Sequence, residues 1–340
     1  MKRIPFLLNS IVVVLSLGVL LISYIPPTKL HFVNYCSLLM PALLVVNFGF
    51  VLYWLLQLNK KVLLSALFLV VSAKSVQRLY GFNFGASRSN QEKGEDTIKL
   101  MTYNSRHFSS ADEHFVFIDE FMEVYKDSFP DILIVQETYT SKIRELKKVY
   151  PYTTKKIKKS NVLSNYILSK YPITNQGLIQ WKDTQMGRDA AFADIKIKND
   201  TIRFYSIHLS SYKFSKKAEE LQKRGGKSIL KRFSQVFKYQ EKQVEIIKTH
   251  IAESPFPVVI GGDFNNNAFS YVYKRLFNSS NFQDTFVAAG SGFGATYDFS
   301  YFPTRIDFIF VPESAVVHAH KIVKRKGWSD HFPVISEISF

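Results

Sequence analysis

Two patterns of hydrophobic residues divide the chain into two unequal parts. Residues 6–25 and 35–58 are apolar runs without a charged side chain, and each is long enough to cross a hydrocarbon layer about 30 Å thick. A third apolar run, residues 62–73, is followed by two basic side chains. It is either a third span over residues 62–80, with the basic side chains reaching the interface, or an amphipathic helix lying in that interface. The pattern predicts a membrane anchor over residues 1–80.

From residue 97 onward the apolar residues follow shorter periods. Strand-like runs are found at residues 97–105, 131–138, 164–173, 190–197, 201–211, 257–265, 305–311 and 330–340. Helical spacing is found at residues 114–129, 228–252 and 271–277. A hairpin-type turn at Asn199-Asp200, combined with longer crossovers, predicts mixed sheets covered by helices and not an all-parallel barrel. Residues 81–96 are rich in Gly, Ser, Asn and charge, so we interpret them as a linker before a domain at 97–340.

Charge is distributed as unevenly as hydrophobicity. Residues 1–80 contain no Asp or Glu, and the whole chain has a net charge of +16. Lys2, Arg3 and the pair Lys60-Lys61 flank the first two spans and favour the cytoplasm for both of these positions. With three spans the second domain faces outward, which we expect, and with two it stays inside. A cleaved signal peptide is the alternative for the first run, but no small-residue cleavage site follows it.

Polar side chains that can carry chemistry stand at the ends of the predicted strands. The stretch GGDFNNNAFS, residues 261–270, is the clearest case, because an apolar run leads directly into an acid and several amides. Across the strands the candidates are Asn104, Glu137, His208, Asp263, Asn265, Asp307, Asp330 and His331. Taken singly, each is more often a turn, a cap or a satisfied half-buried residue. Because ligands of layered α/β folds bind beside strand ends, the repeated pattern predicts one shared pocket.

These side chains suit a divalent metal and a phosphate. The carboxylates of Glu137, Asp263 and Asp330 provide hard oxygen ligands. With amides beside them, and with the single cysteine Cys36 in the apolar part, they favour Mg²⁺ or Mn²⁺ over zinc. His208 and His331 are able to donate to a phosphate oxygen, and Asp307 is able to orient an imidazole. Metal-assisted attack of water on phosphorus uses all of these groups.

Short motifs in a fixed order resemble the endonuclease/exonuclease/phosphatase superfamily, the deoxyribonuclease-I-like hydrolases. The motifs are MTYN (101–104), QE (136–137), YILSKYPI (166–173), IHL (207–209), GDFN (262–265), RIDFIF (305–310) and SDHFPV (329–334). The resemblance covers residues 97–340 and implies an α/β (α+β) four-layer sandwich of two mixed β-sheets flanked by helices. With its N-terminal spans the chain looks like the membrane-anchored bacterial members. This implies the bacterial inner membrane and, with three spans, a periplasmic catalytic domain.

The resemblance also implies roles for the residues on the metal and water side of the site. Glu137 binds the metal with Asn104 beside it, and Asp330 is a further acid on the metal side. Asp263 orients or deprotonates the attacking water, and Asn265 helps to hold the phosphate.

The histidines receive their roles from the same resemblance. His331 contacts the scissile phosphate and pairs with Asp307, while His208 assists the phosphate or the leaving group. Arg188 and Asp189 stand where many members carry an Asn, which makes them candidate substrate-binding residues.

Basic stretches bear on the substrate. Residues 142–159 contain eight Lys or Arg against one Glu, and residues 213–232 contain eight against two. They are either solvated helix faces or surfaces attracted to nucleic acid phosphates or to anionic lipid headgroups. We expect a membrane-anchored phosphodiesterase that depends on Mg²⁺ or Mn²⁺ and acts on nucleic acid or phospholipid. The alternatives are a phosphomonoesterase of lipid or inositol type and a non-catalytic binding module; no protein partner is implied.

Overall fold

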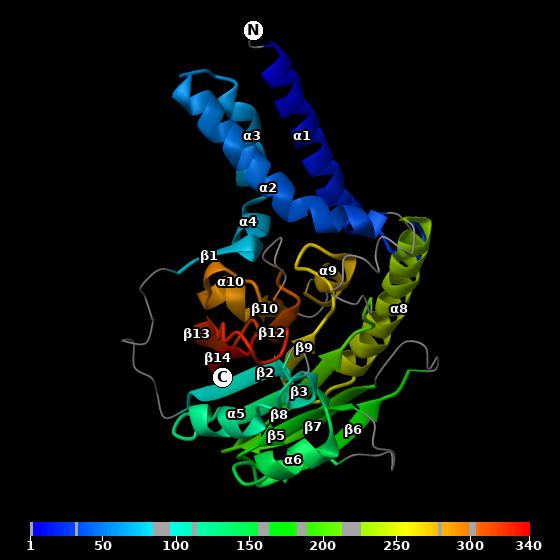
Figure 1. Cartoon of the computed structure of the whole chain (residues 1–340), viewed down its shortest axis with the longest axis vertical. Helices are drawn as coiled ribbons and strands as arrows, with labels where there is room; N and C mark the ends of the chain where they lie inside the picture. Colours follow the sequence, from blue (N-terminus) through cyan, green and yellow to red (C-terminus); the bar gives the residue numbers. More distant parts are fainter. Residues whose placement is uncertain are drawn as a thin grey trace.

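In the computed structural model, a helical bundle projects from an α/β sandwich (Figure 1). The structure describes residues 3–30, 33–83, 96–110, 114–155, 163–181, 189–212, 226–277, 281–298 and 304–340. The N-terminal bundle consists of α1 (Arg3–Ile22), α2 (Val33–Leu56), α3 (Val62–Val71) and α4 (Ala73–Leu79). The helices of the sandwich are η2 (Arg106–Phe108), α5 (Ile118–Tyr125), α6 (Thr140–Leu146), α8 (Gly226–Ala252), α9 (Tyr271–Phe277) and α10 (Thr285–Ala289).

Two six-stranded sheets, within the ranges given above, form the sandwich. The sheet with the order β10-β12-β9-β8-β7-β6 contains β6 (Ile173–Ile179), β7 (Ala190–Ile197), β8 (Asp200–His208), β9 (Val258–Asp263), β10 (Phe282–Asp284) and β12 (Asp307–Pro312). The sheet with the order β13-β14-β2-β3-β5-β4 contains β2 (Ile98–Asn104), β3 (Ile132–Thr138), β4 (Tyr152–Thr153), β5 (Ser164–Ser169), β13 (Val316–Ile322) and β14 (Val334–Ser339). Both sheets are mixed, because β2 with β3 and β8 with β9 are parallel while the other neighbours are antiparallel.

Apolar side chains hold four layers together. Between the sheets, Leu100 and Ile134 of one sheet share a core with Phe204 and Val259 of the other. Helices α8 and α9 pack on the outer face of the first sheet, and α5 and α6 pack on the outer face of the second. Central strands are therefore buried on both faces, which explains their continuous apolar runs. This is the four-layer sandwich that the sequence predicts.

Several element boundaries differ from the apolar pattern. The helix expected over residues 114–129 is confined to α5, because Val116 pairs with Ser109 in an isolated β-bridge and keeps the preceding segment extended. The strand expected over residues 164–173 is divided between β5 and β6, which belong to different sheets. Pro172 lies between them and provides no backbone N–H for continued pairing.

The interval expected to be a linker also begins with regular structure. Strand β1 (Tyr80–Phe82) pairs with β11 (Ser291–Phe293), so the chain leaving α4 is attached to the sandwich at once. The rest of that interval, residues 84–95, lies outside the described residues.

The N-terminal bundle contains two helices that are long and apolar enough to span a membrane. These are α1 and the Tyr35–Leu56 part of α2, whereas α3 and α4 pass the same test only as a pair bent by 77°. Inside the bundle, the Asn9 side chain donates to Ser65 at 3.0 Å and the Asn47 side chain donates to Ser16 at 2.9 Å. Polar side chains on different helices thus satisfy one another, as they do between helices in a bilayer.

The bundle is docked on the sandwich through its near ends. The ammonium group of Lys274 donates to the carbonyl of Leu20 at 3.0 Å, close to the C-terminus of α1. The side-chain amide of Asn267 donates to the carbonyl of Ser37 at 3.1 Å, close to the N-terminus of α2. Phe269 is buried in the apolar core of the bundle itself. Residues that closely follow the β9 strand end therefore belong to the interface with the helices.

Candidate functional site

Strand register brings three of the predicted residues into one row. In the parallel β8–β9 pair His208 lies opposite Asp263, and in the antiparallel β9–β12 pair Asp307 lies opposite the same residue. Gly262 precedes Asp263, and a Cβ atom at this position would lie 2.0 Å from the carbonyl oxygen of Ile207. Glycine therefore allows β8 and β9 to remain paired up to their ends.

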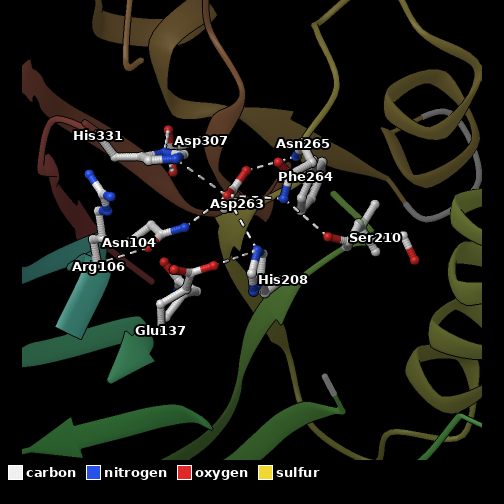
Figure 2. Close-up of polar contacts among 12 residues, drawn as sticks. Asn104, Arg106, Glu137, His208, Ser210, Asp263, Phe264, Asn265, Asp307 and His331 are labelled. Atoms are coloured by element: carbon white, nitrogen blue, oxygen red, sulfur yellow. Dashed lines mark hydrogen bonds and ion pairs between the residues drawn. The ribbon is translucent and has the colours of Figure 1, made fainter. Parts of the chain in front are cut away.

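Asp263 is the centre of a hydrogen-bonded network (Figure 2). Its buried carboxylate accepts from the Asn104 side-chain amide at 3.0 Å, from the Asn265 amide at 3.1 Å and from the Asn265 backbone N–H at 2.7 Å. Asn104 ends β2, so this network joins the two sheets. Asn265 has a φ of 48°, a left-handed conformation that Asn adopts more readily than most residues. The turn thus directs both Asn265 donors back at the carboxylate.

His331 and Asp307 form a buried pair beside Asp263. The Nδ1 atom of His331 lies 3.1 and 3.0 Å from the two carboxylate oxygens of Asp307, and its Nε2 atom lies 3.6 Å from an oxygen of Asp263. Burial alone would lower the pKa of His331, but the carboxylates of Asp307 and Asp263 raise it to about 10. The imidazole is therefore protonated at neutral pH and has a positively charged N–H at Nε2.

Burial has a related effect on Asp263. It raises the pKa of this carboxyl group to about 7, with the positive charge of His331 opposing the rise and the negative charge of Asp307 adding to it. A carboxylate whose pKa lies near neutrality is suited to accept a proton and to release it again. The ring nitrogen Nε2 of His208 also lies 3.6 Å from Asp263, so two imidazoles flank this one acid.

Glu137 and His208 form the opposite side of the site. One Glu137 carboxylate oxygen lies 3.6 Å from Nε2 of His208, and 25% of the Glu137 side chain is exposed. Glu137 has a φ of 52°, although it is not glycine. Such strained residues occur most often at functional sites. Figure 2 shows the Glu137 carboxylate next to the His208 ring, and the same ring next to Asp263.

The donors on the Glu137 side fit a divalent metal. Glu137 and Asp330 offer carboxylates and Asn104 offers an amide oxygen, and all three line the same pocket. These are the hard oxygen donors that Mg²⁺ and Mn²⁺ use. A buried Asp/Asp/His cluster, in which the ligand atoms of Asp263, Asp307 and His331 lie within 4.8 Å of one another, stands beside them. The Nδ1 atom of His331 already contacts the Asp307 carboxylate, so the oxygen donors on the Glu137 side are the better fit.

The site opens into a pocket of about 490 Å³. Arg106 and Tyr297 also line it, and the sequence reasoning did not identify either residue. The Tyr297 ring meets the His331 ring edge to face, with centroids 5.0 Å apart, and so restricts the imidazole. Arg106 comes two residues after Asn104. A basic residue so close to a polar strand end was a signal in the sequence that could have identified it as part of the site. Tyr297 precedes β12 in a segment without a periodic pattern, and we find no sequence signal for it.

The structure gathers one group of predicted residues and leaves the others elsewhere. The pocket is lined by Asn104, Glu137, His208, Asp263, Asn265, Asp330 and His331, and Asp307 lies behind His331. Asp189 is not among the described lining residues; its carboxylate accepts from the Trp181 backbone N–H at 3.3 Å. Outside the described residues lie Arg188 and, from the two basic stretches, residues 156–159 and 213–225.

Sequence comparison identifies two families along the chain. The model of the Endonuclease/Exonuclease/phosphatase family matches residues 101–331, which include every site residue described above. A second model, described as Domain of unknown function (DUF8431), matches residues 2–79, which cover the N-terminal bundle. A search of curated proteins found no match.

Solved structures share the fold of the sandwich. An endonuclease/exonuclease/phosphatase family protein from Bacteroides thetaiotaomicron has a TM-score of 0.53 and 17% identity, over 72% of this chain and 98% of its own. The mannosyl-6-phosphatase of Bacteroides thetaiotaomicron VPI-5482 has a TM-score of 0.51 and 17% identity, over 72% and 100%. D. rerio TDP2 complexed with single strand DNA product has a TM-score of 0.52 and 16% identity, over 72% and 100%. At these identities the likeness shows the fold alone.

Proposed function

Since the chain belongs to the endonuclease/exonuclease/phosphatase family and is a phosphoester hydrolase, we propose that it is a membrane-anchored phosphodiesterase dependent on Mg²⁺ or Mn²⁺. The observation that carries this proposal is the Asp263 network, in which one acid with a near-neutral pKa lies between two imidazoles. Arg305 of the pocket wall lies 2.7 Å from Asp284, and Arg78 and Arg106 line the same pocket, so the site suits an anionic phosphoester.

In the proposed hydrolysis, one proton is removed from the attacking water and one proton is given to the leaving oxygen. Asp263 takes a proton from the attacking water, whose oxygen bonds to phosphorus while the bond to the leaving oxygen breaks. His208 donates a proton to the leaving oxygen, so an alcohol departs, and Asp263 then returns its proton to His208 across 3.6 Å. The charged N–H of His331 stabilises the negative charge on a non-bridging phosphate oxygen. Asp307 keeps the imidazole oriented and protonated.

Metal binding would complete the site. Glu137, Asn104 and Asp330 would hold the ion, which would supply charge neutralisation at the phosphate. Asn104 has a second task in this scheme, since its amide group already fixes the Asp263 carboxylate.

Replacing His331 tests the proposed hydrolysis. We expect the full chain in detergent micelles to hydrolyse bis(p-nitrophenyl) phosphate with Mg²⁺, and His331→Ala to lower kcat/KM by about a hundredfold or more. The matched control is His318→Ala, because His318 lies on β13, accepts or donates to the Ser339 hydroxyl at 2.8 Å, and does not line the pocket. This control should keep wild-type kcat/KM.

The choice of ester decides between the proposed function and its alternatives. Turnover of p-nitrophenyl phosphate in preference to the diester would replace the phosphodiesterase by a phosphomonoesterase. A folded chain that hydrolyses neither ester with either metal would favour a binding module, and equal activity of His331→Ala and wild type would contradict the proposed site.

We also propose that the chain crosses the membrane three times and that its catalytic domain lies outside the cytoplasm. The Lys61 ammonium lies 4.5 Å from the Phe6 ring centroid and 5.2 Å from that of Trp54. This supports placing the basic pairs Lys2-Arg3 and Lys60-Lys61 together at the end of the bundle far from the sandwich. Leu20, at the other end of α1, contacts the sandwich through Lys274. The positive-inside rule then assigns the far end to the cytoplasm.

A reporter enzyme measures this orientation. Alkaline phosphatase fused after Phe340 and expressed in a bacterial host should be active, because it folds only outside the cytoplasm. The same reporter fused after Lys61 should be inactive. An inactive reporter after Phe340, or an active one after Lys61, would contradict the three-span arrangement.

A further inference from the structure

The pocket that contains the proposed catalytic network has a wall built by the N-terminal bundle. Asp263 and His331 lie at its catalytic end. Leu38 and Pro41 of α2 and Leu79 of α4 contribute to the same pocket, although more than a hundred residues separate them from those two. The site is therefore composite, with one end formed by polar strand ends and another by apolar side chains of the helices.

One segment of the sandwich fixes this apolar wall relative to the acid. The stretch that follows Asp263 first supplies Asn265, which bonds the carboxylate, and then Asn267, which bonds the Ser37 carbonyl at 3.1 Å. Phe269 completes the segment by packing in the apolar core of the bundle, and it lines the pocket as well. Because a single short segment joins the acid to α2, the catalytic end and the apolar wall keep a fixed separation.

Arg78 adds a positive charge to the wall. Only 8% of this side chain is exposed, and its guanidinium lies 4.9 Å from the Tyr273 ring centroid and 5.5 Å from that of Phe277. The neighbouring Arg305 is paired with Asp284, whereas no carboxylate of the residues the structure covers forms an ion pair with Arg78. A buried cation that lacks a carboxylate partner and lines a phosphoester pocket suits an anionic group of the substrate.

The apolar wall lies where the helices leave the sandwich. Figure 1 shows the lower end of α2 and helix α4 next to the sandwich, while α1, α2 and α3 extend away from it. Leu38 is 39% exposed at this end of α2, and its neighbour Leu39 is 57% exposed. In a membrane-anchored chain this end of the helices lies at the bilayer surface, so the pocket is within reach of lipid molecules.

On the basis of the proposed function, we propose that the substrate is a membrane lipid carrying a phosphoester. Its phosphoester group lies against Asp263 and His331, and its apolar part lies against Leu38, Pro41 and Leu79. Water adds its oxygen to phosphorus, the P–O bond to the leaving alcohol breaks, and that alcohol receives the proton. The pocket also contains the aromatic side chains Phe269 and Tyr297, of the kind on which nucleic acid bases stack. The N-terminal bundle, however, contributes the aliphatic side chains Leu38, Pro41 and Leu79, which suit acyl chains better than bases.

Acyl chains are the feature to vary in the experiment. The full chain in mixed micelles is given phosphatidylglycerol, phosphatidylethanolamine or phosphatidic acid, each beside its deacylated counterpart with the same phosphoester. Mass spectrometry measures the products of cleavage on either side of phosphorus. These are diacylglycerol and phosphatidate from the two acylated diesters, diacylglycerol alone from phosphatidic acid, and glycerol or glycerol phosphate from the deacylated forms. We expect at least one lipid to be hydrolysed with kcat/KM about tenfold or more above its deacylated form, since the wall binds only the apolar part.

Two adjacent leucines provide the variant and its control. Leu38→Gln should lower the ratio of kcat/KM for that lipid to kcat/KM for bis(p-nitrophenyl) phosphate by about tenfold. Leu39→Gln, on the same turn of α2 but not lining the pocket, should leave both constants unchanged. The comparison of acylated with deacylated substrate uses the wild-type chain, so it remains decisive if Leu38→Gln does not fold.

The outcomes separate this inference from the proposed function. Hydrolysis of bis(p-nitrophenyl) phosphate or of single-stranded DNA, with none of the three lipids cleaved, overturns the lipid inference and leaves the hydrolase in place. Equal kcat/KM for acylated and deacylated forms, or equal ratios for Leu38→Gln and Leu39→Gln, overturns the role of the wall. Failure on every phosphoester, soluble and lipid, overturns the proposed function itself.

Discussion

Asp263→Asn is expected to lower kcat/KM for bis(p-nitrophenyl) phosphate by about a thousandfold, the largest effect of any single substitution in this chain. The carboxylate accepts from two side-chain amides and one backbone N–H. An amide at the same position is unable to take a proton from water, and its NH₂ group would face the donors of Asn104 and Asn265. Steady-state kinetics of the full chain in detergent, with saturating Mg²⁺, measures the loss.

Asp131→Asn is the matched control for this substitution. Asp131 directly precedes β3, and its carboxylate accepts from the Lys99 backbone N–H at 2.9 Å, away from the pocket. The control should keep wild-type activity, and circular dichroism should show both variants folded. If a folded Asp263→Asn chain retained activity within about tenfold of wild type, Asp263 would not be the proton acceptor.

The gathering of the site was predictable because strand ends share an edge of a sheet. Asp263, His208 and Asp307 end or begin adjacent strands, so ordinary pairing places them in one row. The same periodicity that identified the strands therefore located these side chains. Asn104 and Glu137 come from the facing sheet, and their approach to Asp263 depends on two sheets meeting face to face, which the family resemblance implied and the apolar pattern alone did not.

The composite pocket was not predictable from local pattern. Leu38 and Arg78 belong to segments whose hydrophobicity indicated only an association with the membrane, and nothing in their spacing shows that they also face a site. Their position depends on contacts between distant residues, such as Asn267 with Ser37 and β1 with β11. The stretch GGDFNNNAFS contains one predictable and one unpredictable part. Its acid, Asp263, is recognisable as the end of a strand, whereas nothing in the sequence shows that Asn267 and Phe269 contact the N-terminal helices.

Removal of the divalent metal is expected to abolish hydrolysis by the full chain, and addition of Mg²⁺ or Mn²⁺ to restore it. Glu137 is the carboxylate best placed to bind the ion, because its side chain is partly exposed to the pocket. Glu137→Gln keeps the shape of the side chain but removes its charge. We expect it to raise the metal concentration for half-maximal activity by about tenfold or more, since loss of outer-shell partners alone weakens metal binding about 10–100-fold.

Titrating activity against Mg²⁺ separates a metal ligand from a structural acid. A Glu137→Gln chain that lacks only a ligand should recover part of its kcat at high Mg²⁺, whereas loss of a proton acceptor at Asp263 is not recovered by any metal concentration. Glu145→Gln is the control, because Glu145 lies on α6 and pairs with Lys148 at 2.6 Å on the surface. Full activity after exhaustive chelation, or the same Mg²⁺ dependence in Glu137→Gln and wild type, would contradict a metal at this carboxylate.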